Sequence, residues 1–85
     1  MTFYVYLIVS KISDKYISYV GYTNNLENRI NKHNSGLGAK FTKGKKWKLI
    51  YYECYDTKIK AMKAEYKLKK NYNLRKKIKK NNGFY

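Results

Sequence analysis

The sequence predicts an α/β chain of the α+β class, with its elements in the order β-β-α-β-α-α. Three runs of β-branched and aromatic residues are typical of strands, at residues 3–9, 16–20 and 47–55. Three segments with apolar residues at helical spacing begin near residues 26, 58 and 74. Because the chain contains no linker or repeat, we expect residues 1–85 to form one domain with a thin core.

The composition is strongly basic. Twenty Lys and Arg residues against five Asp and Glu residues give a formal net charge of +15, so a polyanion is the expected partner, and nucleic acid is the commonest one. Eleven tyrosines and 44% apolar residues are typical of a chain that folds. A single cysteine, Cys54, excludes an internal disulfide and a four-cysteine zinc site, which favours a cytoplasmic location. No membrane segment is expected, because the apolar run at residues 3–9 is too short to span a bilayer.

The first two strands are expected to form an antiparallel hairpin. The first strand contains neither Gly nor Pro, which suits a central strand covered on both faces. Alternation then places Tyr6 on one face and Val5 and Leu7 on the other. The turn is predicted at residues 10–15, and Gly21 is expected to end the second strand.

The first helix is predicted to begin near Leu26. Asn24 and Glu27 have the spacing of a capping box, with an amide in place of the usual hydroxyl. Arg29 and His33 follow at positions i and i+4, so their side chains lie on the same side of the helix. The helix therefore presents an arginine and a histidine together.

A glycine-rich basic loop at residues 36–46 follows this helix. It resembles a phosphate cradle, but the spacing of a P-loop and its terminal Lys-Ser/Thr are missing. Two interpretations remain: contact with a nucleic-acid backbone, or a mobile loop with solvated lysines. The candidate nucleic-acid-binding residues are Lys40, Lys43, Lys45 and Lys46.

In the third strand, strict alternation places Leu49 and Tyr51 on the same face, with Ile50 on the other. Cys54 in this strand is most simply a packing residue. Asp56 and Thr57 then provide an N-cap for the next helix.

The last two elements are predicted helices, over residues 58–70 and 74–80, the second starting from Asn73. In the first of them, stepping roughly 100° per residue brings six apolar residues onto one arc: Ile59, Ala61, Met62, Ala64, Tyr66 and Leu68. Glu65 falls inside this arc, where a carboxylate is costly unless it is paired. Either a neighbouring Arg or Lys neutralises it, or it is a ligand for a hard cation such as Mg²⁺.

These residues match the needs of phosphodiester hydrolysis, which are an activated water and stabilisation of charge on the phosphoryl oxygens. Glu65 would hold the metal ion. Arg29 would clamp the phosphate. Tyr6 or Tyr19 would take the proton of the water.

The sequence resembles the GIY-YIG endonuclease family, in the small single-domain branch that is similar to excision-repair and resolvase catalytic domains. The first motif corresponds to Tyr4-Val5-Tyr6 and the second to Tyr19-Val20-Gly21, and the family's other site residues match Arg29, His33 and Glu65. The resemblance covers residues 3–70, leaving a basic C-terminal helix at about residues 73–82. It implies a three-stranded antiparallel sheet flanked by helices, with one divalent ion at a positively charged face.

The resemblance further implies a DNA endonuclease that works by in-line attack of water with a single Mg²⁺ or Mn²⁺ ion. Structured or damaged DNA in repair or recombination is the expected substrate, and Tyr19 is our choice of general base. A partner protein would supply the choice of target, and a homodimer would allow both strands to be cut.

The alternative is a non-catalytic basic module that binds DNA or RNA and retains the fold. Each single residue also has a structural interpretation. His33 would serve as a helix C-terminal cap, and Arg29 would pair with Glu27 or with the backbone. The joint match with Glu65 favours the enzyme.

Overall fold

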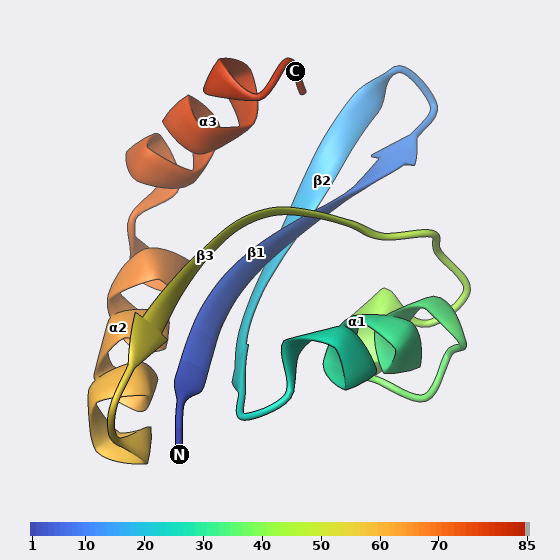
Figure 1. Cartoon of the computed structure of the whole chain (residues 1–85). Helices are drawn as coiled ribbons and strands as arrows, with labels where there is room; N and C mark the ends of the chain where they lie inside the picture. The colour runs from blue at the N-terminus through green and yellow to red at the C-terminus, as the bar shows by residue number, and fades with distance from the viewer. Residues whose placement is uncertain (85) are drawn as a thin grey trace.

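The computed structural model describes residues 1–84, in which one antiparallel sheet of three strands carries helices on both faces (Figure 1). This architecture confirms the predicted fold class and element order. The elements are β1 (Phe3–Ile12), β2 (Lys15–Thr23), α1 (Leu26–Asn34), a short 3-10 helix (Lys40–Thr42), β3 (Lys48–Tyr55), α2 (Lys58–Lys70) and α3 (Tyr72–Asn81).

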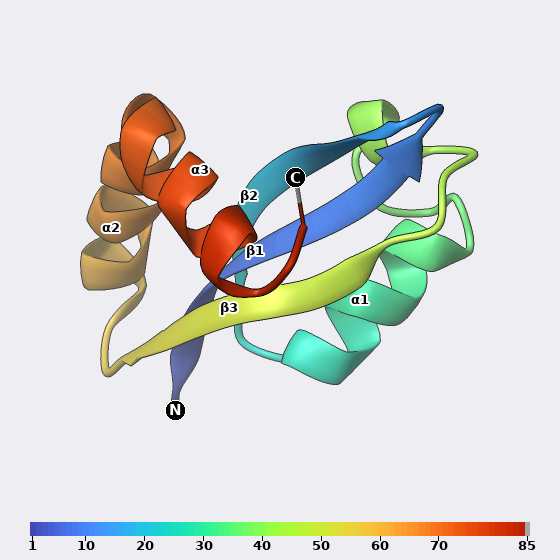
Figure 2. The ribbon, with the colours of Figure 1, turned by 90° about the horizontal axis from the view of Figure 1, so that it is seen from above.

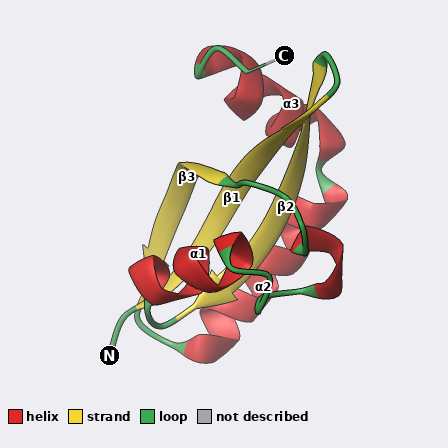
Figure 3. Cartoon of the chain, turned by 90° about the vertical axis from the view of Figure 1, so that its right-hand side faces the viewer, coloured by secondary structure: helices red, strands yellow, loops and turns green. Residues whose placement is uncertain are grey.

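The strand order is β2-β1-β3, so β1 lies in the centre of the sheet. Helix α1 covers one face, whereas α2 and α3 cover the other (Figures 2 and 3). Successive residues of β1 point to opposite faces: Val5 and Leu7 pack in one apolar cluster with α2 and α3, and Tyr6 and Ile8 in another beside Trp47. The predicted burial of β1 on both faces is confirmed.

The β1–β2 hairpin is longer than predicted. Its strands pair as far as Ile12 and Lys15, so the turn is confined to two residues, and Ser13 adopts a left-handed conformation with φ of 57°. The prediction that Gly21 ends β2 is wrong. Strand β2 continues to Thr23, because Gly21 is fully paired with the central strand opposite Tyr6.

The prediction of strict alternation along β3 is also wrong. Leu7 pairs with Tyr51 and Ile8 pairs with Leu49, which leaves Ile50 as an extra residue in a β-bulge. The bulge moves Tyr51 to the face that packs on α2 and α3, while Leu49 stays on the face of Tyr6.

Two helix starts differ from the predicted ones. The N-cap of α1 is Asn25, whose side chain accepts a hydrogen bond from the backbone of Asn28, and the predicted capping box from Asn24 does not form. The N-cap of α3 is Asn71 in place of Asn73. In both cases the correct residue is another Asn nearby, which sequence spacing alone does not distinguish. Thr57 caps α2 as predicted.

The predicted apolar arc of α2 is only partly buried. Ala61 and Leu68 lie in the core, but three of the six apolar residues are exposed: Ile59, Met62 and Tyr66. Cys54, predicted to pack, is exposed as well. The sheet has only three strands, so it is too narrow to cover the whole arc. Over residues 1–84, no helix has the length and apolar character needed to cross a membrane.

Candidate active site

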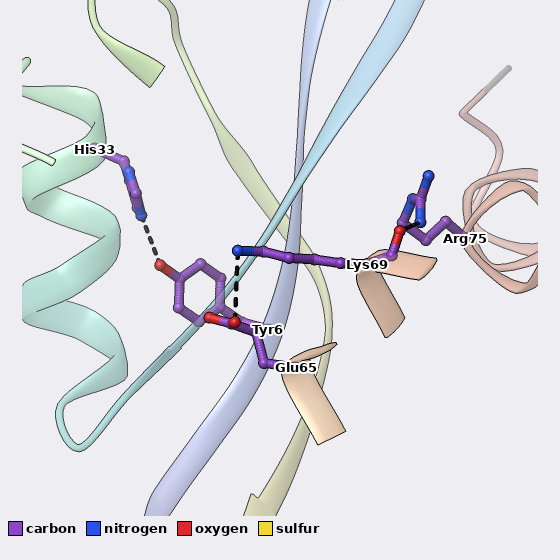
Figure 4. A network of polar contacts seen from close by, with 5 residues as sticks. All are labelled: Tyr6, His33, Glu65, Lys69 and Arg75. Carbon is purple, nitrogen blue, oxygen red and sulfur yellow. Dashed lines mark hydrogen bonds and ion pairs between the residues drawn. The ribbon is translucent and has the colours of Figure 1, made fainter. Parts of the chain in front are cut away.

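A pocket of about 580 Å³ brings four of the five predicted site residues together. Its walls come from β1, β2, α1 and α2, and the predicted residues in them are Tyr6, Tyr19, Arg29 and Glu65. The remaining one, His33, lies directly behind Tyr6 (Figure 4). Residues from opposite faces of the sheet therefore meet at one place.

Gly21 allows Tyr6 to occupy its position. The two residues are partners in the β1–β2 ladder, and the ring of Tyr6 lies across the backbone of Gly21. A Cβ at residue 21 would collide with the phenol oxygen and with the ring carbon that carries it. Any larger residue would displace Tyr6, so the glycine serves close packing here rather than a turn.

His33 is fully buried and has a hydrogen-bond partner on each ring nitrogen. The hydroxyl of Tyr6 lies 2.7 Å from Nε2, and the hydroxyl of Thr42 lies 2.8 Å from Nδ1. Burial, together with the nearby charge of Arg29, lowers the pKa of His33 to about 4, so the imidazole is neutral at pH 7. Because both ring nitrogens bond to side chains, the interpretation of His33 as a helix C-terminal cap is wrong.

Burial also raises the pKa of Tyr6 above its usual value of 10. The guanidinium of Arg29 acts in the opposite direction on the same group. Among residues 1–84, neither of the two ion pairs includes Arg29 or Glu27, so the alternative in which Arg29 pairs with Glu27 is not found. The arginine instead lines the pocket beside Tyr6.

Glu65 reaches the pocket from α2 with 19% of its side chain exposed. Its carboxylate oxygen lies 3.4 Å from Nζ of Lys69, one helical turn later (Figure 4). A lysine is therefore close enough to pair with Glu65, as the structural alternative required, and the role of Glu65 as a metal ligand stays a prediction. The end of this helix is held by Arg75 of α3, which donates to the backbone carbonyls of Leu68 and Lys69.

Tyr19 forms the aromatic wall of the site. Its ring packs edge-on against His33 and Trp47, and it is stacked with Phe41 at 6.0 Å between ring centroids. Within residues 1–84, its hydroxyl takes part in none of the side-chain hydrogen bonds. In this respect it differs from Tyr6.

The four loop lysines do not line this pocket. Lys45 instead donates to the carbonyl of Phe41 and lies over its ring. The cationic side chains in the pocket wall are Arg29, Lys32 and Lys58. The sequence reasoning missed both lysines. Lys32 lies one turn after Arg29 on α1, whereas Lys58 reaches the pocket from the start of α2, which only the fold brings there.

The donor set fits a hard divalent ion that keeps much of its water. Among residues 1–84, nowhere do three His, Cys, Asp or Glu side chains gather closely enough to hold a metal ion by themselves. Mg²⁺ is usually bound by one or two carboxylates together with water and substrate phosphates. The single carboxylate of Glu65, in a pocket wide enough for a phosphate, is consistent with that mode of binding.

Three supporting residues were missed by the sequence reasoning: Gly38, Thr42 and Trp47. Thr42 and Trp47 are both buried, and Asn34 joins them to α1 by bonding to both backbone groups of Trp47. The sequence signal that could have indicated these supporting residues is a threonine and the single tryptophan in or beside a lysine-rich loop. Both lie in or next to the loop at residues 36–46, for which the sequence left two interpretations, backbone contact and solvated lysines.

Comparison with known proteins identifies the family. The sequence profile of the GIY-YIG catalytic domain matches residues 2–81. The chain belongs to the GIY-YIG family. This result confirms the resemblance inferred from the two tyrosine motifs. The family is one of nucleases that generally act on nucleic acid with the help of a metal ion.

Similar GIY-YIG relatives occur in several bacteria. The chain is 47% identical over 68 residues to UPF0213 protein CPE1444 of Clostridium perfringens, covering 79% of this chain and 70% of that protein. It is 55% identical to UPF0213 protein BLi00048/BL00536 of Bacillus licheniformis, over 61% of this chain and 55% of that protein. A solution NMR structure of UPF0213 protein BH0048 from Bacillus halodurans is 36% identical, with a TM-score of 0.48, covering 91% of this chain and 80% of that one.

Proposed function

We propose that this GIY-YIG protein is a DNA endonuclease that hydrolyses phosphodiester bonds with one divalent metal ion, Mg²⁺ or Mn²⁺. The observation that carries the proposal is the meeting of two tyrosines, an arginine and a glutamate in one pocket, in a chain with a net charge of +15. A carboxylate, a phosphate clamp and a proton acceptor are a sufficient set for in-line attack of water on phosphorus.

Arg29 is positioned to clamp the scissile phosphate. Its guanidinium offers several N–H donors that match two phosphate oxygens at once. Glu65 would hold the metal ion after giving up Lys69. When bound there, the ion would supply Lewis acidity toward a phosphate oxygen and toward water.

We assign Tyr19 as the general base. The hydroxyl of Tyr6 is engaged with His33, and burial raises the pKa of Tyr6, so Tyr6 is a poor acceptor of a proton from water. Tyr19 lines the same pocket, and its hydroxyl has no such partner within residues 1–84.

We further propose that residues 1–85 act as a single nuclease domain, with the basic helix near residues 73–82 as an extra contact to DNA. The substrate is structured or damaged DNA in repair or recombination. Lys32 and Lys58 would hold the backbone close to the pocket, and the four loop lysines would hold it further away. A partner protein would select the target, and a homodimer would cut both strands.

The test is cleavage of labelled duplex, single-stranded, flap and four-way-junction DNA, with and without Mg²⁺ or Mn²⁺. We expect metal-dependent cutting by the natural protein. Glu65→Gln should lower cleavage by about a thousandfold or more, because it removes the only carboxylate in the pocket wall. DNA binding, measured by fluorescence anisotropy, should be almost unchanged.

Asp14→Asn is a matched control, since it removes one negative charge from the hairpin turn, outside the pocket. Wild-type rates in Glu65→Gln would refute the role of Glu65. Tight, salt-sensitive DNA binding without cleavage under any metal condition would favour the non-catalytic binding module instead.

A further inference from the structure

A chain of three hydrogen bonds runs behind the pocket. The hydroxyl of Tyr6 lies 2.7 Å from Nε2 of His33, and Nδ1 of His33 lies 2.8 Å from the hydroxyl of Thr42. The Thr42 hydroxyl in turn donates to the carbonyl of Ala39 at 2.8 Å. The side chains of Tyr6, His33 and Thr42 are all fully buried, so water does not offer alternative partners.

The direction of every bond in this chain follows from its last member. A carbonyl oxygen only accepts, so the hydroxyl of Thr42 donates its one proton to the carbonyl of Ala39. The Thr42 oxygen can therefore only accept from His33, which places a proton on Nδ1. A neutral imidazole has one N–H, so Nε2 is an acceptor, and the phenol proton of Tyr6 points at it.

The neutral state of His33 agrees with its surroundings. Its ring is enclosed, and the nearby Arg29 further disfavours a second positive charge, so its pKa is held near 4. At pH 7 the imidazole therefore carries one N–H proton, in agreement with the donors and acceptors assigned above.

We infer that Thr42 is a positioning residue of the site: through His33, it fixes the direction of the Tyr6 hydroxyl. The hydroxyl proton of Tyr6 points toward His33, so its oxygen presents only lone pairs to Arg29. Arg29 is close enough to lower the pKa of Tyr6. This arrangement would orient Arg29 and leave its other N–H groups for a bound phosphate. The tautomer rests on the hydrogen bonds alone, and its effect on catalysis rests on the proposed nuclease function.

Neighbouring residues hold the hydrogen-bonded side chains of Tyr6, His33 and Thr42 in one arrangement. The indole N–H of Trp47 donates to the backbone carbonyl of Thr42 at 2.9 Å, which anchors the 3-10 helix. Gly38 lies against the imidazole, where a Cβ would collide with Nδ1 and would lie 3.0 Å from Cα of His33. A residue larger than glycine would push the ring out of line with Thr42.

The tautomer can be measured directly, because the chain has a single histidine. In a long-range ¹H–¹⁵N NMR spectrum of the full-length protein at pH 7, we expect Nδ1 at the frequency of a protonated nitrogen. Nε2 is expected at the frequency of an unprotonated nitrogen. The opposite assignment, or rapid averaging of the two, would overturn the inference. This measurement needs neither metal nor DNA.

Thr42→Val provides the second test. The variant leaves no acceptor for Nδ1–H, so the proton should move to Nε2, and the two nitrogen frequencies should exchange. Thr42→Ser should restore the wild-type pattern. Thr57→Val is a matched control, because it removes the N-cap of α2 and lowers stability without contact with His33. A Val variant that keeps Nδ1–H would refute the role of Thr42.

Cleavage kinetics then test the catalytic consequence. We expect kcat of Thr42→Val to fall about 10- to 100-fold, the range seen for outer partners that orient a ligating histidine. KM for DNA should be unchanged, and Thr42→Ser should recover most of kcat. An exchanged tautomer with unchanged kcat would refute the positioning role. The absence of any cleavage by the natural protein would refute only the proposed nuclease, leaving the NMR result to decide the tautomer.

Discussion

The two faces of the sheet bury different kinds of side chain. On the face covered by α2 and α3, the buried residues are wholly apolar: Val5, Leu7, Val20, Ala61, Leu68 and Ile78. On the face covered by α1, Tyr6, His33, Thr42 and Trp47 are buried together with their polar atoms. Alternate residues of β1 contribute to the two sides, so one strand serves both.

The two faces therefore contribute differently, one through apolar burial and the other through hydrogen-bonded polar side chains. Burial of carbon on the α2/α3 face stabilises the fold without any need for compensating partners. A buried polar group costs free energy unless it is hydrogen-bonded, so each group on the α1 face has to be paired. Within residues 1–84, no buried side-chain nitrogen or oxygen lacks a partner. The α1 face is therefore ordered by directional bonds, as a site requires.

The largest expected effect concerns stability on the apolar face. Leu7→Ala should lower the free energy of unfolding by about 3 kcal/mol, since Leu7 is completely buried. Tyr6→Phe, next to it in the same strand, should cost about 1 to 2 kcal/mol, because it leaves Nε2 of His33 without its donor. Urea denaturation of both variants gives the two values.

NMR of His33 sharpens the same comparison. Leu7→Ala should leave the nitrogen frequencies of His33 unchanged, whereas Tyr6→Phe should shift that of Nε2. If Tyr6→Phe were the more destabilising of the two, the division between a stabilising face and a functional face would be wrong.

A second prediction concerns pH. The pKa of His33 is about 4 in the folded protein and 6.5 in an unstructured chain, so between these values the unfolded chain binds more protons. Stability should therefore decrease as the pH falls from about 6.5 to about 4, by roughly 2 to 3 kcal/mol in total. Denaturation at several pH values measures this loss.

His33→Gln isolates that contribution, because the carboxylates titrate in both proteins. The difference in stability between wild type and variant should shrink as the pH falls. A difference that stays constant from pH 7 to pH 4 would contradict a buried neutral imidazole.

The smallest expected effect concerns the carboxylate of the pocket wall, Glu65. Glu65 is partly exposed and paired with Lys69, which competes with a cation for the carboxylate. Lys69→Gln should strengthen metal binding about two- to fivefold, since an exposed pair of this kind is worth less than about 1 kcal/mol. The concentration of Mn²⁺ that gives half-maximal cleavage measures this shift.

Lys60→Gln is the matched control, because Lys60 forms the equivalent i,i+4 pair with Asp56 on an exposed part of α2. The control should leave the metal dependence unchanged. Equal shifts in both variants would show a general effect of net charge, and no shift in Lys69→Gln would argue against Glu65 as the ligand.

The parts of the fold that the sequence predicted are those with local causes. Alternation in β1 correctly assigned its residues to two faces, since a period of two follows from strand geometry. The i,i+4 spacing of Arg29 and His33 correctly placed them beside each other along α1. Glu65 attracted attention as a carboxylate on an apolar arc, and it lines the pocket.

The parts that it missed depend on contacts between distant segments. The bulge at Ile50 follows from the pairing of β3 with β1, and no residue type in β3 predicts it. Thr42 lies nine residues after His33 in a loop whose glycines and lysines drew the interpretation toward phosphate binding. Tyr66 appeared apolar and therefore buried, but it is 62% exposed because three strands do not cover the helix.

The sequence by itself determined the order of elements, the basic surface and the types of side chain available for hydrolysis, because these depend on composition and short-range spacing. Only the tertiary structure decided which tyrosine is hydrogen-bonded to His33 and which one has no such bond among residues 1–84. It also decided the direction of the hydrogen bonds between Thr42, His33 and Tyr6. The physical reason is that a pKa and a tautomer depend on burial and on the partner of each atom, and both arise only when α1, the loop and β1 pack together.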